Sequence, residues 1–132
     1  MDIWLLVGIF VIVDLALLTF AVVSRSRRGF SAADKRIYQE HWRRIQTLDA
    51  RQAVMEADKM LDEIMGKRGY KGTLGDKLKK AGPAFSSVND VWSAHKLRNR
   101  LAHELGAKIS LEEARLALKR FARAYKDMGM NL

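Results

Sequence analysis

Apolar and polar residues alternate with helical spacing along most of this chain. The clearest segment runs from Ala50 to Met65, where apolar residues recur at intervals of three and four positions. That period is typical of a helix with one buried stripe. The charged residues between them, Asp58 included, are expected on the solvent-facing side. Gly66 and Gly69 follow the segment, and glycine is common where helices end.

Three further segments carry the helical period. The first begins near Ser31 and is expected to run over residues 31–48. A second helix is expected over residues 88–105, with Gly106 in the position of a C-terminal cap. A third begins at Ser110-Leu-Glu-Glu113, which has the spacing of a capping box, and continues to the end of the chain.

The stretch from residue 69 to residue 83 is irregular, because it holds four of the nine glycines and the only proline. We expect turns here around a short helix that contains Leu74 and Leu78. No segment shows the two-residue alternation of a strand. Residues 31–132 are therefore predicted to form an all-α bundle of four longer helices and one short helix, with loops short enough for antiparallel neighbours.

The first part of the chain is apolar on every side. Residues 3–23 contain one charge, Asp14, and about 20 apolar residues suffice for a helix to cross the hydrocarbon core of a bilayer. No lysine or arginine precedes this run, whereas a cleaved signal peptide has its positive charge first. Arg25, Arg27 and Arg28 follow the run, where they would meet anionic lipid headgroups. The positive-inside rule places the N-terminus outside and the rest of the chain in the cytoplasm.

This pattern divides the chain into a transmembrane anchor at 1–24, a basic juxtamembrane linker at 25–30 and a cytoplasmic bundle domain at 31–132. The alternative is a core helix of a soluble bundle. Such a helix needs an apolar stripe on one side only, so a run that is apolar on all faces favours the membrane span. An ionised Asp14 within the span would cost about 2.5–3.5 kcal/mol on insertion scales. Asp14 either joins two copies of the chain in the membrane or is a tolerated polar residue in an anchor.

The soluble part is strongly basic. The chain has 24 lysines and arginines against 15 acidic residues, and every cation lies after residue 24. Such a charge suits RNA or the anionic inner leaflet, and a solvated helical face has the same composition. The absence of cysteine excludes disulfides and thiolate chemistry and fits a cytoplasmic location. Three histidines without neighbouring cysteines predict no metal site, and no cofactor is expected.

The candidate chemistry lies in the string Arg98-Asn99-Arg100-Leu101-Ala102-His103. An arginine can neutralise a phosphate, and a histidine can move a proton near neutral pH. His95, Asn99 and His103 follow one another at intervals of four and so share a helix face. Arg98 lies about 140° from His103 on an ideal helix. The two can therefore meet one phosphate only if the helix ends there or a second copy contributes its own pair.

This string resembles the motif of the HEPN family (higher eukaryotes and prokaryotes nucleotide-binding domains). That motif is an arginine, often followed by Asn, Asp or His, with a histidine after four to six intervening residues. Arg98, Asn99 and His103 fill these places. The resemblance implies an all-α bundle that acts as a homodimer, with two motifs lining one cleft, and that cleaves RNA without metal. His103 would assist attack by a 2′-hydroxyl, Arg98 would hold the phosphate, and Asn99 would orient both.

Three interpretations of the motif stay open. They are catalysis, binding without cleavage, and a purely structural role as a buried polar network or an inactive dimer interface. His95, Lys96 and Arg100 are the candidate substrate-binding residues, although His95 can also be a histidine packed beside Trp92. The sequence thus predicts a membrane-anchored HEPN-like ribonuclease. The alternative is a non-catalytic membrane-tethered module that binds RNA, a protein partner or anionic lipid.

Overall fold

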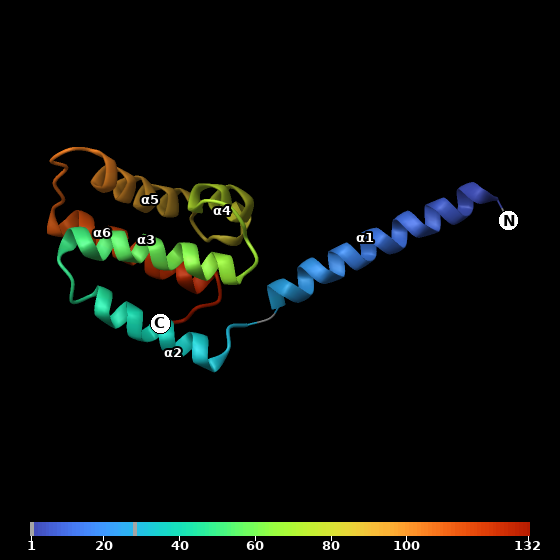
Figure 1. Cartoon of the computed structure of the whole chain (residues 1–132), viewed down its shortest axis with the longest axis horizontal. Coiled ribbons are helices and arrows are strands. Elements are labelled where there is room, and N and C mark those ends of the chain that lie inside the picture. Colours follow the sequence, from blue (N-terminus) through green and yellow to red (C-terminus); the bar gives the residue numbers. More distant parts are fainter. Residues whose placement is uncertain (1, 28) are drawn as a thin grey trace.

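A computed structural model describes residues 2–27 and 29–132, with side chains described for residues 2–21 and 29–132. Every regular element in these ranges is helical, which confirms the predicted all-α fold class. The elements, labelled in Figure 1, are α1 (Ile3–Arg27), α2 (Ala32–Ile45), α3 (Ala50–Lys67), α4 (Leu74–Ala81), the 3-10 turn η1 (Gly82–Ala84), α5 (Val88–His103) and α6 (Leu111–Asp127).

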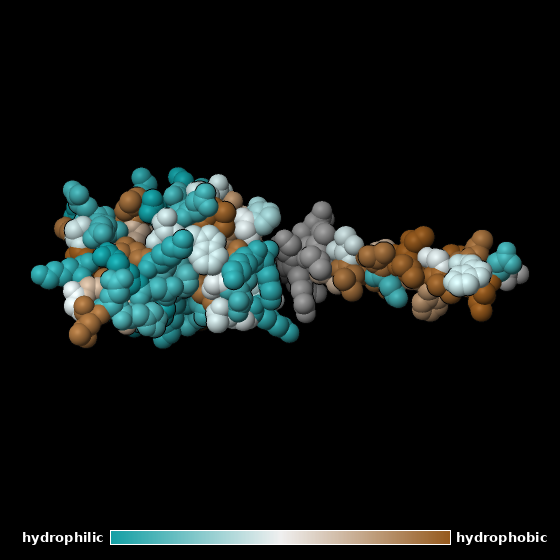
Figure 2. Space-filling view, turned by 90° about the horizontal axis from the view of Figure 1, so that it is seen from above, coloured by the Kyte–Doolittle hydropathy of each residue, from teal (hydrophilic) through white to brown (hydrophobic). Residues whose placement is uncertain are grey.

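Helix α1 extends away from the bundle formed by the other helices (Figure 1). Its segment Ile3–Ala21 is long and apolar enough to cross a membrane, and none of it is buried against the rest of the chain. Figure 2 shows this contrast, with apolar side chains along α1 and hydrophilic ones over much of the bundle face in view. The described part of the chain therefore does not cover Ile3–Ala21. Asp14 is exposed within this segment.

The lipid contacts predicted for Arg25, Arg27 and Arg28 lie outside the described residues and side chains. They remain a prediction.

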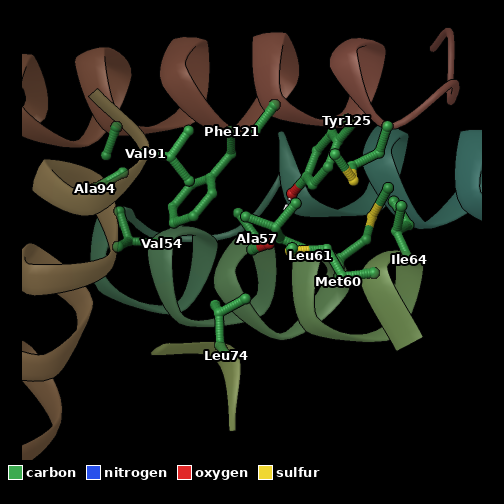
Figure 3. Packing of buried hydrophobic residues seen from close by; sticks show 14 of the residues in the cluster. Val54, Ala57, Met60, Leu61, Ile64, Leu74, Val91, Ala94, Phe121 and Tyr125 are labelled. Atoms are coloured by element: carbon green, nitrogen blue, oxygen red, sulfur yellow. Dashed lines mark hydrogen bonds between the residues drawn. The ribbon is translucent and has the colours of Figure 1, made fainter. Parts of the chain in front are cut away.

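Helix α3 is the centre of the bundle, because it packs against α2, α4, α5 and α6. Figure 3 shows its apolar stripe, including Val54 and Leu61, facing Phe121 and Tyr125 of α6. These four side chains are fully buried. Burying one large apolar side chain contributes about 1.5–3 kcal/mol, so this stripe accounts for the central place of α3.

Hydrogen bonds at the helix starts agree closely with the sequence pattern. Ser110 and Glu113 form the predicted capping box: the Ser110 hydroxyl accepts from the Glu113 N–H at 3.1 Å, and the Glu113 carboxylate accepts from the Ser110 N–H at 2.9 Å. Ser31 caps α2 by accepting from the Asp34 N–H at 3.0 Å. The Asp34 carboxylate, however, does not complete a capping box, because it forms an ion pair with Lys67 Nζ of α3 at 2.7 Å. The first turn of α2 is therefore tied to α3 by an ion pair.

Two of the predicted helices end earlier in the structure than expected. The helix predicted over residues 31–48 ends at Ile45, and the helix predicted over residues 88–105 ends at His103. Glu104 is the C-cap of α5, so the prediction of Gly106 as the cap is wrong; Gly106 lies in the following turn with φ +71°, a left-handed conformation that glycine adopts without steric cost. Leu105, the last residue of the predicted helix, is fully exposed because the chain leaves the helix before it.

Tyr125→Phe is expected to lower the free energy of unfolding by about 0.5–1.5 kcal/mol, the net contribution of one lost hydrogen bond. The buried Tyr125 hydroxyl donates to the Ala57 carbonyl at 2.7 Å, and burial raises the pKa of Tyr125 well above its usual value. Urea denaturation of the full chain measures the loss. Tyr38→Phe is the matched control, since the Tyr38 hydroxyl has no hydrogen-bond partner among the described residues. Equal losses in both variants would contradict this assignment.

Candidate functional site

A buried carboxylate organises the site between α3 and α5. Asp58 is only 3% exposed, so its predicted place on the solvent-facing side of α3 is wrong. His95 of α5 places its Nδ1 2.7 Å from Asp58 Oδ1, and Arg98 places its Nε 3.4 Å from Asp58 Oδ2. Buried charges require such partners, because desolvation of an unpaired carboxylate is costly. Two residues from the motif region are thus bound to one carboxylate.

Asn99 links these two partners of Asp58. Its Nδ2 lies 3.3 Å from His95 Nε2, and its Oδ1 accepts from Arg98 Nη1 at 3.0 Å. These contacts are mutually consistent when His95 is neutral and carries its proton on Nδ1. His95 then donates to Asp58 and accepts from Asn99, which leaves the Asn99 oxygen for Arg98. Asn99 therefore connects Arg98 with His95, whereas the resemblance implies that it orients Arg98 and His103.

Arg98 lies at the edge of this network, with its side chain 32% exposed. Its Nε is buried without a hydrogen-bond partner, and the ion pair with Asp58 compensates its charge. The guanidinium is consequently held in one position by Asp58 and Asn99. Only part of it reaches solvent.

His103 lies apart from the network. It is exposed and is the last residue of α5, and its side chain has no hydrogen bond or ion pair within the described parts of the chain. On an ideal helix it points about 140° away from Arg98. One copy of the chain therefore bonds Arg98, Asn99 and His95 to one another and leaves His103 outside these bonds.

The three candidate substrate-binding residues occupy different environments. Lys96 is exposed, and Arg100 is partly exposed and pairs with Glu113 of α6 at 3.3 Å. His95 is buried in the Asp58 network, with its ring edge-on to Trp92 at a centroid distance of 6.0 Å. His95 thus has the environment of the alternative interpretation, a histidine packed beside Trp92. Lys96 and Arg100 share the outward face of α5 with His103, because helical residues three and four apart are neighbours.

Arg51 fixes the end of α5, a role that the sequence did not indicate. It extends from the first turn of α3, and its Nη1 donates to the Ala107 carbonyl at 3.3 Å. Its Nη2 donates to the Leu101 carbonyl. A cation on these carbonyls satisfies groups that a helix end leaves unpaired. Arg51 thereby positions the segment that carries His103.

No group of three or more His, Asp or Glu side chains able to hold a metal ion comes together in the described parts of the chain. Comparisons with protein-family models, curated proteins and solved structures found no match. These comparisons do not test the resemblance to the HEPN family, which stays a prediction made from the six-residue motif.

Proposed function

We propose that this chain is a membrane-anchored HEPN-like protein in which α5 carries half of a metal-independent RNA-cleaving site. A second copy of the chain completes that site. The observation that carries the proposal is the separation of the motif: Arg98 is fixed against Asp58, while His103 is exposed at the end of the same helix. Each copy can thus present either group to the other.

In this proposal the outward face of α5 meets the RNA backbone through Lys96 and Arg100. His103 removes the proton of a ribose 2′-hydroxyl, and the 2′-oxygen bonds to the adjacent phosphorus. The bond from phosphorus to the 5′-oxygen breaks and that oxygen takes a proton from water, while His103 returns its proton to the solvent, so the products are a 2′,3′-cyclic phosphate and a 5′-hydroxyl. The partner's Arg98 stabilises the charge that develops on the phosphate oxygens. The reaction needs no metal or cofactor.

The anchor supports the same proposal. Helix α1 would hold the chain as a single-pass protein of the cell membrane, with the N-terminus outside and the bundle in the cytoplasm. Two copies confined to one membrane meet at a raised effective concentration, so a homodimer forms more readily. A hydrogen bond from Asp14 across two α1 helices would add to this association.

Cleavage is tested by incubating the full chain, in detergent or nanodiscs, with RNA in the presence of EDTA. We expect cleavage by the parent chain and a loss of about 10²–10⁴-fold in His103→Ala, the usual contribution of a general acid or base. His41→Ala is the matched control, because His41 lies on α2, away from the motif. Equal cleavage by the parent and His103→Ala, or none by the parent, would refute the catalytic proposal.

A second candidate function is binding without cleavage. It is favoured by the ion pair between Arg98 and Asp58, since a compensated guanidinium has less charge to offer a phosphate. This candidate requires RNA binding that weakens with salt and survives His103→Ala. Replacement of Lys96 or Arg100 by glutamate would weaken it. Binding and cleavage measured on the same samples separate the two functions.

A further inference from the structure

Basic side chains gather at the end of the bundle from which the chain continues to α1. The start of α2 and the turn between α3 and α4 both lie at this end, and the α5–α6 loop lies at the opposite end (Figure 1). The bond from Lys67 Nζ to Asp34 Oδ1, 2.7 Å long, joins the α3 end to the start of α2. The end of α3 and the start of α2 thus lie next to each other on this end of the bundle.

Phe30 fixes the chain to this surface immediately after the linker. Its ring packs edge-on against Tyr38 at a centroid distance of 6.4 Å. The Arg68 guanidinium lies 4.9 Å above the same ring, and Arg68 Nε donates to the Met128 carbonyl at 2.6 Å. Arg68 is therefore held in place from two sides.

A surface hollow of about 480 Å³ opens beside Phe30. Its charged lining residues are Asp34, Lys67, Arg68 and Lys71, three cations and one carboxylate. Lys80 adjoins the hollow, because its Nζ lies 3.5 Å from the Lys71 carbonyl oxygen. The hollow has the chemistry of a site for a phosphate group.

The length of the connection places this hollow close to a membrane that contains α1. The apolar run ends at Val23, and the four helical residues to Arg27 add about 6 Å. Three more residues reach Phe30 and span at most about 11 Å. The headgroup layer occupies about 5–7 Å of that distance, and electrostatic attraction acts over about a further 8–10 Å at physiological salt.

We propose that this hollow binds the phosphate of an anionic lipid headgroup and holds the adjoining end of the bundle on the membrane surface. The proposal rests on the membrane anchoring of α1 and is independent of RNA cleavage. It assigns a lipid phosphate to Lys67, Arg68 and Lys71, in addition to the headgroup contacts predicted for the linker arginines. It also directs the opposite end of the bundle, where α5 ends at His103, away from the lipid.

The test uses the absence of cysteine in the chain. Ala33→Cys, in the first turn of α2, carries a donor dye, and the full chain is reconstituted with acceptor dye on lipid headgroups. We expect higher energy transfer in phosphatidylcholine–phosphatidylglycerol vesicles than in phosphatidylcholine vesicles. Lys71→Glu with Lys80→Glu should abolish that difference. Lys108→Glu with Arg115→Glu, which changes the charge equally at other exposed positions, should preserve it.

Circular dichroism establishes that both double variants retain their helices before transfer is compared. Equal transfer in the two kinds of vesicle, or an undiminished difference in Lys71→Glu with Lys80→Glu, would overturn the lipid site. Alkaline carbonate extraction is a separate readout of the anchor. A chain that resists extraction but shows no transfer difference refutes the lipid site alone, and an extracted chain refutes the anchoring and the lipid site together.

Discussion

Asp58→Ala is expected to lower the free energy of unfolding by about 3–5 kcal/mol, the largest stability effect that we predict for one side chain. Breaking a buried ion pair from one side leaves the other charge without compensation. Here one carboxylate holds both the Nδ1 of His95 at 2.7 Å and the Nε of Arg98 at 3.4 Å. Because α3 is the central helix, the loss also loosens the attachment of α5. Urea denaturation followed by far-ultraviolet circular dichroism measures it.

Glu63→Ala is the matched control for this prediction. Glu63 lies on the same helix and is exposed, and exposed substitutions usually change stability by less than about 0.5 kcal/mol. A double-mutant cycle with Arg98→Ala then separates the ion pair from lost packing. Residues in one network should show a coupling energy of about 0.5–3 kcal/mol. If Asp58→Ala and Arg98→Ala are additive, the network does not hold α5 in the way proposed here.

The helices and the main core were predictable from the sequence because their information is local. The apolar stripe of α3 and the capping box at Ser110 depend on spacing within a few residues, and both agree with the structure. The end of α5 was less predictable. It depends on Arg51, which reaches 50 and 56 positions along the chain to two carbonyls. No local pattern carries that information.

Asp58 shows why the centre of the site could not be assigned from sequence. A charged residue beside an apolar stripe is normally placed in solvent, and the burial of Asp58 depends on two side chains of another helix that bond to it. One signal was present: Asp58 lies four residues after Val54 and three before Leu61, within the buried stripe itself. A carboxylate at such a position needs a partner. That His95 and Arg98 are its partners becomes clear only from the packing of α5 on α3.

The structure also changes what the motif can do within one copy. Arg98 and Asn99 are tied to Asp58, and His103 is on the outward side of α5. Because α5 stays helical through its last residue, His103, a proposal in which Arg98 and His103 act on one phosphate depends on a second chain. This dependence can be tested directly, because two inactive variants should complement one another when they share a dimer.

We expect that Arg98→Lys and His103→Ala chains, each nearly inactive alone, recover cleavage when they are reconstituted together. Lysine keeps a charge for the ion pair with Asp58 but lacks the planar fork that binds a phosphate through two bonds. In a mixed dimer, His103 of the Arg98→Lys copy faces Arg98 of the His103→Ala copy. Half of the dimers are mixed and each contains one complete pair, so the rate should reach roughly a quarter of the parent rate.

The control is the same amount of each variant in separate vesicles that are then combined, where dimers cannot exchange subunits. In that combined sample, RNA cleavage in the presence of EDTA should stay at the level of the single variants, about 10²-fold or more below the parent. Recovery only after shared reconstitution would require the arginine and the histidine to come from different chains. If shared and separate samples cleave equally slowly while the parent is active, the complete pair must come from one copy, and α5 must then rearrange to release Arg98 from Asp58.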